Sequence, residues 1–220
     1  MKSNILLLID RYLPNPLSSA VMYRDLAQEL SYRGNAITII AGASDISSEI
    51  ETSIEAGVKV IRIKSPDLKS NWFKRLFNEM ALGRRIWKYT KNSVNYSDFD
   101  MVIYYSPTIF WSSLVRKLKR KVNLNTYLVL RDLFPKWAAD LGIISKYGLI
   151  YFFFKIFEYK LYRTADCIGV QSPNSIRYFA ENFYLRSFKT EVLYNWVKIE
   201  DANFEKSSLR EDLDLNDKII

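Results

Sequence analysis

The sequence contains no histidine and only one cysteine, Cys167, among its 220 residues. Without histidine the chain cannot build a Ser-His-Asp triad, a Cys-His pair or a histidine-ligated metal site. Acid–base chemistry must therefore use Asp, Glu, Lys or Tyr side chains. A single cysteine forms no disulfide within the chain, which fits a reducing compartment. Because Cys167 lies inside an apolar run, we expect it to be a core residue.

Glycine is also sparse, and neither a G-x-G-x-x-G fingerprint nor a Walker loop occurs anywhere in the chain. Long apolar runs are absent too. The longest, YGLIYFFFKIF, is well short of the roughly 20 residues that cross a bilayer. The start of the chain has a lysine and a short apolar run but no small-residue cleavage site, so no signal peptide is evident. We expect a cytoplasmic protein whose membrane contact, if any, is peripheral.

Positive charge and aromatic side chains are abundant instead. The chain carries 32 basic and 24 acidic residues, a net charge of +8, and 15% of its residues are aromatic. Such a surface attracts anions, which include nucleic acid, anionic lipid and phosphorylated small molecules. Composition does not choose between these partners. At this length, with 49% hydrophobic residues, one large domain or one domain and part of another is expected.

Short apolar runs alternate with helical patterns along the chain. Strands are predicted at 4–9, 36–41, 58–63, 100–105, 126–131, 166–171 and 191–194, and helices at 18–33, 71–91, 107–120, 146–164 and 173–183. Several strands are apolar on both faces, as in a parallel sheet that helices cover. This order predicts an α/β fold with a Rossmann-like, doubly wound, mainly parallel sheet in residues 1–197. The loops after the strand ends then meet at one edge, where ligands bind.

The polar segment 198–220 follows and ends on two isoleucines. We interpret it as a linker and the start of a further domain, with a simple tail as the alternative. Two helix boundaries support the prediction of the preceding domain. Gly34 stops the first helix, and Ser172 caps the last one, with Pro173 at its first position.

The loop after the first strand, IDRYLPNPLSSA, leads directly into a helix, an arrangement that turns free backbone N–H groups toward an anion. Pro14 and Pro16 stiffen this loop. Ser18 and Ser19 stand at the helix start, and Ser18 is the expected N-cap. A phosphate-facing loop and a plain strand–helix connection fit the sequence equally well.

The strand at 100–105 continues into YYSPTIF. Ser106 is expected to cap the next helix, with Pro107 at its first position, and this structural role is favoured. The loop nevertheless reaches the same edge as the first loop. Tyr105, Ser106 and Thr108 are therefore candidates for a shared cleft.

Arg131 and Asp132 stand side by side where the strand at 126–131 ends, in VLRDLFPKWAADLGIISK. A surface turn would explain a charged pair at that position, and so would an active site.

Two stretches are basic, aromatic and amphipathic. In 71–91 the cations oppose a single acidic residue, Glu79, and include Lys74, Arg75, Arg84, Arg85 and Lys88. In 146–163 an aromatic helix carries Lys146, Lys155, Lys160 and Arg163. Both are typical of helices that lie on an anionic membrane surface. The alternative is an apolar face in the core with solvated cations; it is as good for 71–91 and slightly favoured for 146–163.

Four short motifs follow in order between Tyr104 and Val197: YYSP, LRDLFPKWAADLGIISK, YRTADCIGVQSPNSI and VLYNWV. The last three are similar to the segments QDxWPxxxxxLG, ADxIxxxS and PNWVD of bacterial family 4 (group 1) glycosyltransferases. The opening ILLLIDRYLPNP is similar to the first strand and proline-containing loop of that family. The chain therefore resembles the N-terminal domain of these enzymes, of the type that builds O-antigen and colanic acid.

This resemblance implies one half of a GT-B fold, in which two Rossmann-like domains face each other across a cleft. It implies a retaining transfer from a nucleotide sugar, expected to be a UDP-sugar, without a metal or other cofactor. The acceptor implied is a saccharide on a polyprenyl diphosphate at the inner face of the cytoplasmic membrane, in O-antigen or capsule synthesis. The second domain, with a paired-glutamate motif, would hold the donor, so we expect these 220 residues alone to be inactive.

Under this interpretation Asp132 is the catalytic candidate, because an aspartate at a strand end can orient an acceptor hydroxyl or take its proton. An ion pair with Arg131 and an N-cap for the helix in PKWAADLG are the alternatives. The residues predicted to line the acceptor and donor cleft are Pro14, Ser18, Ser19, Tyr105, Ser106, Thr108, Arg131, Trp137, Ser172 and Asn195. The family often has glycines where this chain has Ser18 and Ser19.

The cations of 71–91 are the predicted contacts to an anionic membrane surface. Two other classes remain as hypotheses. A nucleic-acid-binding module is favoured by charge alone, and no RNP, helix-turn-helix or zinc motif supports it, so nucleic acid is not expected. A non-catalytic membrane adaptor would show the same basic helices as an enzyme.

Overall fold

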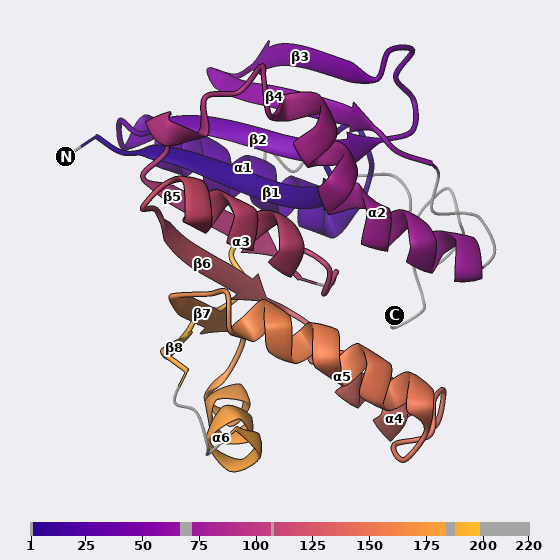
Figure 1. Ribbon diagram of the computed structural model, residues 1–220. Coiled ribbons are helices and arrows are strands. Elements are labelled where there is room, and N and C mark those ends of the chain that lie inside the picture. Colours follow the sequence, from indigo (N-terminus) through magenta and orange to yellow (C-terminus); the bar gives the residue numbers. More distant parts are fainter. Residues whose placement is uncertain (1, 67–71, 107, 184–187, 199–220) are drawn as a thin grey trace, which may run out of the picture.

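The computed structural model describes residues 2–66, 72–106, 108–183 and 188–198, without the side chains of residues 72, 73 and 75. Within these ranges the strands form one sheet in the order β3-β4-β2-β1-β5-β6-β7-β8 (Figure 1). They are β1 (Asn4–Arg11), β2 (Ala36–Ala43), β3 (Ile50–Glu55), β4 (Val58–Lys64), β5 (Met101–Tyr105), β6 (Asn125–Leu130), β7 (Cys167–Val170) and β8 (Thr190–Val192). All neighbours are parallel except β3 and β4. The predicted α/β fold with a mainly parallel sheet is confirmed.

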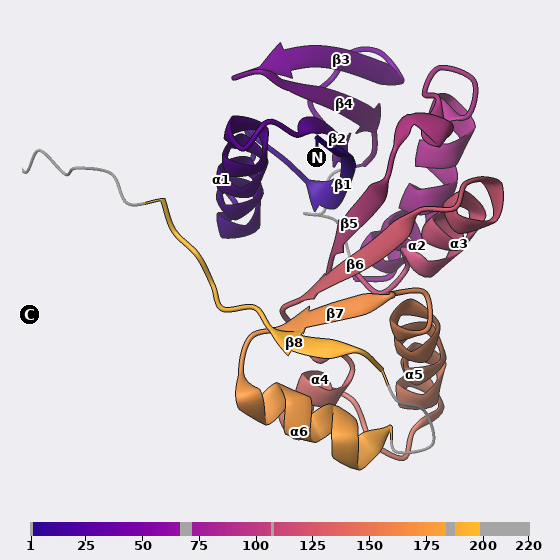
Figure 2. The ribbon, with the colours of Figure 1, turned by 90° about the vertical axis from the view of Figure 1, so that its left-hand side faces the viewer.

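Helices cover both faces of this sheet (Figure 2). They are α1 (Ser18–Tyr32), α2 (Trp72–Thr90), α3 (Ser112–Lys121), α4 (Lys136–Asp140), α5 (Leu149–Tyr162) and α6 (Pro173–Asn182), with a 3₁₀ turn, η1 (Tyr96–Asp98). Alternation along β1 explains the two faces. Leu6 and Leu8 join a core with α2, α3 and α5, whereas Ile5 and Leu7 join a core with α1. None of the described helices is long and apolar enough to span a bilayer.

Strand β3 has no counterpart among the predicted strands. It forms the sheet edge, and its pattern IETSIE leaves most side chains exposed or half-buried, so it lacks the apolar run that marks the inner strands. Ala56 and Gly57 connect it to β4 with φ values of 48° and 80°. Two consecutive positive φ values are typical of a tight hairpin turn, which explains the single antiparallel pair.

Two predicted helix caps are wrong. The backbone N–H of Ser106 still bonds to the carbonyl of Val129 at 3.1 Å, so this residue continues the sheet, and α3 begins only at Ser112. Ser18 is already inside α1, whose N-cap is Leu17 and makes no side-chain cap hydrogen bond.

Cys167 is half-buried rather than a core residue.

The other two predicted boundaries are confirmed. Gly34 follows α1 with a φ of 89°, which suits glycine after a helix end. Ser172 Oγ accepts a hydrogen bond from the backbone N–H of Ser175 at 3.3 Å and caps α6.

Candidate functional site at the carboxyl edge of the sheet

The central strands β1 and β5 define the place where a ligand is expected. Strand β1 pairs with β2 on one side and with β5 on the other. The helix that follows β1 covers one face of the sheet, and the helix that follows β5 covers the opposite face (Figure 2). The crevice outside the carboxyl ends of such strands is where open α/β sheets bind ligands. The carboxyl ends of β1, β5 and β6 bring Asp10, Tyr105 and Arg131 to this crevice.

On the α2 side, a pocket of about 300 Å³ opens beside the end of β1. Its polar groups are Asp10, Glu79 and Thr108. Its apolar wall comes from α2, α4, α5 and the loops between them, and consists of Leu76, Ile109, Phe110, Phe134, Trp137, Ala138, Ile143, Ile144 and Phe154. Phe134 lies between Trp137 and Phe154, with ring centroids 5.9 and 4.8 Å away. An aromatic wall facing carboxylates can take a ligand that has apolar faces and hydroxyl groups.

Asp10 is the most perturbed group of this pocket. The residue is partly exposed, but its Oδ1 atom is buried and has no hydrogen-bond partner among the described residues. Loss of hydration, together with the charge of Glu79, raises the pKa of this carboxyl from 3.8 to about 6. Backbone hydrogen bonds and the charge of Arg11 oppose the rise. A carboxyl in a pocket with a raised pKa and an oxygen that lacks a hydrogen-bond partner is typical of functional sites.

On the α1 side, Arg131 lies among aromatic residues. Its guanidinium stands 4.8 Å from the ring centroid of Trp196, and its Nη1 donates to the carbonyl of Leu193 at 3.0 Å. Its Nε and Nη2 atoms are buried without a partner in the described part of the chain. Desolvation lowers the pKa of Arg131, and Tyr105 and Tyr23 oppose this. The guanidinium stays charged, so its Nε and Nη2 atoms are hydrogen-bond donors that lack an acceptor among the described residues.

The rings around Arg131 hold one another in place. Tyr23 of α1 meets Tyr105 edge to face, with ring centroids 5.2 Å apart, and Tyr105 also bonds to Ser19. Trp196 Nε1 donates to the carbonyl of Met22 at 2.9 Å, which ties the segment after β8 to α1. The hydroxyl of Tyr23 is buried without a hydrogen-bond partner among the described residues.

Asp132 follows Arg131 and is exposed, yet the neighbouring protein atoms desolvate its carboxyl enough to raise its pKa. Neither alternative role is found. Helix α4 has Pro135 as its N-cap, and no described residue forms an ion pair with Asp132. Neither of these two roles therefore explains Asp132 within the described residues, and its catalytic role stays a prediction.

Four of the other predicted cleft residues lie in or beside the pocket, whereas Ser106 and Pro14 have different surroundings. Thr108 and Trp137 line the pocket, and Ser19 and Tyr105 lie on its α1 side. Ser106 is fully buried, with an Oγ that has no partner in the described ranges. Pro14 follows a cis peptide bond, and the carbonyl before it accepts from Arg62 at 2.6 Å.

Ser172 serves as the cap of α6, Ser18 lies in the first turn of α1, and Asn195 is exposed after β8. No contact with the pocket is found for these three within the described residues.

Four residues of the site, Asp10, Glu79, Tyr23 and Trp196, were not among those predicted for the cleft. Asp10 carried a signal: it is the first charged residue after a strictly apolar run, at the carboxyl end of the first strand. The others come from helices or from the chain after β8, so only the fold brings them to the crevice.

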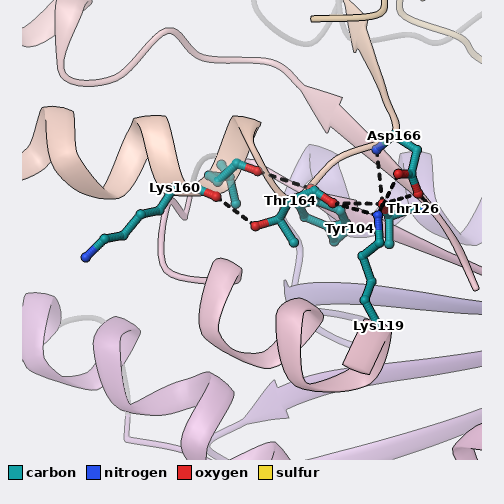
Figure 3. A network of polar contacts seen from close by, with 7 residues as sticks. Tyr104, Lys119, Thr126, Lys160, Thr164 and Asp166 are labelled. Carbon is teal, nitrogen blue, oxygen red and sulfur yellow. Dashed lines mark hydrogen bonds and ion pairs between the residues drawn. The ribbon is translucent and has the colours of Figure 1, made fainter. Parts of the chain in front are cut away.

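The motif around Asp166 belongs to the opposite edge of the sheet. Its carboxylate accepts from the Thr126 N–H at 2.9 Å, the Thr126 hydroxyl at 2.8 Å and Lys119 Nζ at 2.5 Å (Figure 3). The Thr126 hydroxyl lies 2.9 Å from the Thr164 carbonyl. Hydrogen bonds from Lys119 and Thr126 lower the pKa of Asp166 despite some desolvation. This network joins α3, β6 and β7 and is structural.

No group of three or more Cys, Asp or Glu side chains in the described residues is placed to hold a metal ion.

The sheet and its helices form the fold of one half of the GT-B glycosyltransferase structures. An E. coli structure named trehalose-6-phosphate, bound with UDP-2-fluoro glucose, superposes with a TM-score of 0.60 at 12% identity, over 89% of this chain and 49% of that one. A sucrose-phosphate synthase from Thermosynechococcus elongatus superposes with a TM-score of 0.56 at 12% identity, over 96% of both chains. Arabidopsis thaliana UGT89C1, complexed with UDP-L-rhamnose, superposes with a TM-score of 0.57 at 13% identity, over 92% of this chain and 54% of that one. These likenesses establish the fold.

The chain belongs to glycosyltransferase family 4, whose family description matches residues 19–201. It spans about half the length of the first of these structures. No curated protein sequence matches it.

Proposed function

We propose that the full-length protein is a retaining glycosyltransferase that moves a hexosyl or N-acetylhexosaminyl group from a UDP-sugar to a saccharide on a polyprenyl diphosphate lipid. In this proposal the described domain binds the acceptor, and a second domain binds most of the donor without a metal ion. O-antigen or capsule synthesis is the proposed setting. The observation that carries the proposal is the pocket at the end of β1, where Asp10, whose Oδ1 atom has no hydrogen-bond partner among the described residues, lines the same cavity as an aromatic wall.

The pocket suits a sugar because the faces of a pyranose ring are apolar and its rim carries hydroxyl groups. Trp137 and Phe134 offer flat surfaces to such a ring. When ionised, Asp10 can accept hydroxyl hydrogen bonds through both of its oxygens, and with a pKa of about 6 this is its main form at neutral pH. We assign to Asp10 the orientation of the acceptor hydroxyl, and to Asp132 the proton that this hydroxyl loses.

Arg131 supplies the complementary charge. Its two unpartnered nitrogen atoms, Nε and Nη2, form one side of a planar fork that matches two phosphoryl oxygens. The contact with Trp196 and the bond to Leu193 fix the plane of the guanidinium before a ligand arrives. We propose that it binds a phosphate of the diphosphate that either substrate carries.

The proposed location is the inner face of the cytoplasmic membrane, where the protein would bind peripherally. On α2, Lys74, Arg84 and Lys88 are exposed, as a contact with anionic lipid needs. Arg85 is half-buried, and the side chain of Arg75 lies outside the described residues. Leu82 and Ile86 of the same helix are buried, so the apolar face of α2 is largely core. Its cations remain available to a membrane without insertion of that face.

The test is sugar transfer by the full-length protein, with a panel of UDP-sugars and a lipid-linked acceptor. We expect transfer with retention, a loss of about 100-fold or more in Asp10→Asn, and a comparable loss in Arg131→Lys because the fork is gone. Asp45→Asn, which changes an exposed carboxylate on the loop after β2, is the matched control and should keep full activity. Absence of transfer with every donor, or full activity in Asp10→Asn, would refute the proposal.

A further inference from the structure

A second cavity lies between α3 and α5, away from the carboxyl edge of the sheet. It has a volume of about 870 Å³ and is an open groove. Six cations line it: Arg116, Lys119, Arg120, Lys155, Lys160 and Arg163. The described lining contains no acidic residue and is completed by Phe152, Ile156, Tyr159, Thr164 and Phe183. A groove with this charge attracts anions, and its aromatic wall attracts apolar groups.

The groove continues into an exposed apolar strip along α5. Leu149 is 89% exposed and Phe152 is 54% exposed, although both are large apolar residues on a helix. Leu149, Phe152, Phe153 and Ile156 share one face at helical spacing, while Phe154, Glu158 and Leu161 are buried on the other. Leu141, Ile143 and Tyr147, in the segment that precedes α5, are exposed as well, and Ile143 also lines the pocket of Asp10. Exposed apolar surface on this scale marks a contact with a partner or a membrane.

Internal pairs fix the frame of the groove and leave its outer cations open. Lys119 pairs with Asp166, and Lys155 pairs with the buried Glu158. The backbone carbonyl of Lys160 accepts from Thr164 Oγ1 at 2.7 Å, while its side chain points away from the polar network (Figure 3). Arg116, Arg120, Lys160 and Arg163 have no acidic partner among the described residues. They are free to meet an external anion.

We propose that this groove and the α5 strip dock onto an anionic phospholipid bilayer. Headgroup phosphates would bind the outer cations in the groove, and Leu149, Phe152 and Ile156 would enter the boundary between headgroups and acyl chains. Charge complementarity selects this occupant, because a protein partner for the strip alone would not need four open cations beside it. The inference moves the principal membrane contact from α2 to α5. It rests on the proposed function only for the lipid-linked acceptor that docking would bring to the pocket.

The experiment is flotation of the full-length protein with vesicles of phosphatidylcholine containing about one-quarter phosphatidylglycerol. The wild-type protein should float with these vesicles. With vesicles of pure phosphatidylcholine it should remain in the bottom fraction. The variant Arg116→Gln/Arg120→Gln/Lys160→Gln should bind roughly 100-fold more weakly, since each cation near an anionic surface is worth about a fivefold change. The variant Lys2→Gln/Arg33→Gln/Lys59→Gln removes the same charge from other exposed positions and should float like wild type.

A second pair of variants tests the apolar strip. Leu149→Asn/Phe152→Asn should lower vesicle binding by about tenfold or more, whereas Tyr32→Asn/Ile54→Asn, at exposed positions elsewhere, should not. Thermal unfolding of each variant shows that the protein folds. Equal flotation of wild type on neutral and anionic vesicles, or normal flotation of the groove variant, would overturn the inference.

Self-association that Leu149→Asn/Phe152→Asn abolishes would overturn the inference as well, because it would assign the strip to a second copy. Transfer to a water-soluble acceptor separates this inference from the proposed function. A wild type that floats but transfers nothing would refute the function and leave the docking surface standing.

Discussion

Replacing Asp10 with asparagine should stabilise the protein while it disables the pocket. Asparagine has the shape of aspartate but never carries the charge that burial makes unfavourable. In wild type the pKa rises from 3.8 to about 6 on folding, so the folded state binds the proton more tightly than the unfolded state. Such a group contributes stability that is complete below pH 3.8 and is lost as the pH rises through about 6.

The magnitude follows from the shift. A change from 3.8 to about 6 corresponds to about 3 kcal/mol at neutral pH, because one pKa unit is worth about 1.4 kcal/mol. The residue is partly exposed and solvent screens part of this energy, so we expect Asp10→Asn to gain about 1–3 kcal/mol at neutral pH. The gain should vanish near pH 4, where wild type is also uncharged.

Urea unfolding of both proteins at several pH values between about 4 and 8 measures this difference directly. The decisive result is how this difference depends on pH. The unfolding free energy of wild type minus that of Asp10→Asn should become more negative as the pH rises. A difference that does not change with pH, or a destabilised Asp10→Asn at pH 7 with an unchanged denaturant slope, would show that the carboxyl is not held in the environment described.

Three further changes test other parts of the structure. Asp132→Asn should cut transfer by the full-length protein sharply with little change in melting temperature, because the exposed carboxyl has no ion-pair partner among the described residues; normal turnover would remove Asp132 from the mechanism. Gly169→Ala should destabilise the fold by about 1–3 kcal/mol, since the new methyl group meets the Tyr127 hydroxyl and lies 3.0 Å from Leu193 Cβ. A second change, Tyr127→Val, should recover part of that loss in chemical denaturation, and no recovery would contradict the contact. Asp166→Asn should cost about 1–3 kcal/mol through its lost hydrogen bonds. Folding lowers the pKa of Asp166, so this cost should be full above pH 3.8 and shrink in acid; a constant cost would exclude the charge as its cause.

The inner strands could be predicted because a parallel sheet buried on both faces needs uninterrupted apolar runs, which β1 and β2 have. Strand β3 could not, because an edge strand buries few side chains and its sequence resembles a loop. The prediction of where α3 begins was wrong for another reason. Ser106 and Pro107 form a good capping pair, but the bond from Ser106 to Val129 holds the backbone in the sheet. Tertiary structure overrode local preference there.

The candidate site was predictable in its position and only partly in its members. Topology placed Tyr105, Thr108 and Arg131 at one edge, and the structure brings them there. Asp10 was missed because it lies inside β1, where the sequence offered only a charge after an apolar run. Trp196 reaches Met22 across 174 positions, a contact that no local pattern encodes. The raised pKa of Asp10 depends on burial, which exists only after folding.

The position of Ile143 links the pocket of Asp10 to the proposed membrane-facing surface. This residue lines the pocket of Asp10 and is also 65% exposed in the segment that leads into α5. A protein docked through the α5 strip would have its pocket open at the level of the leaflet. It would then meet its acceptor by lateral diffusion in two dimensions. Turnover would follow the mole fraction of acceptor among the lipids, and adding inert phospholipid at constant total acceptor would slow the enzyme by surface dilution.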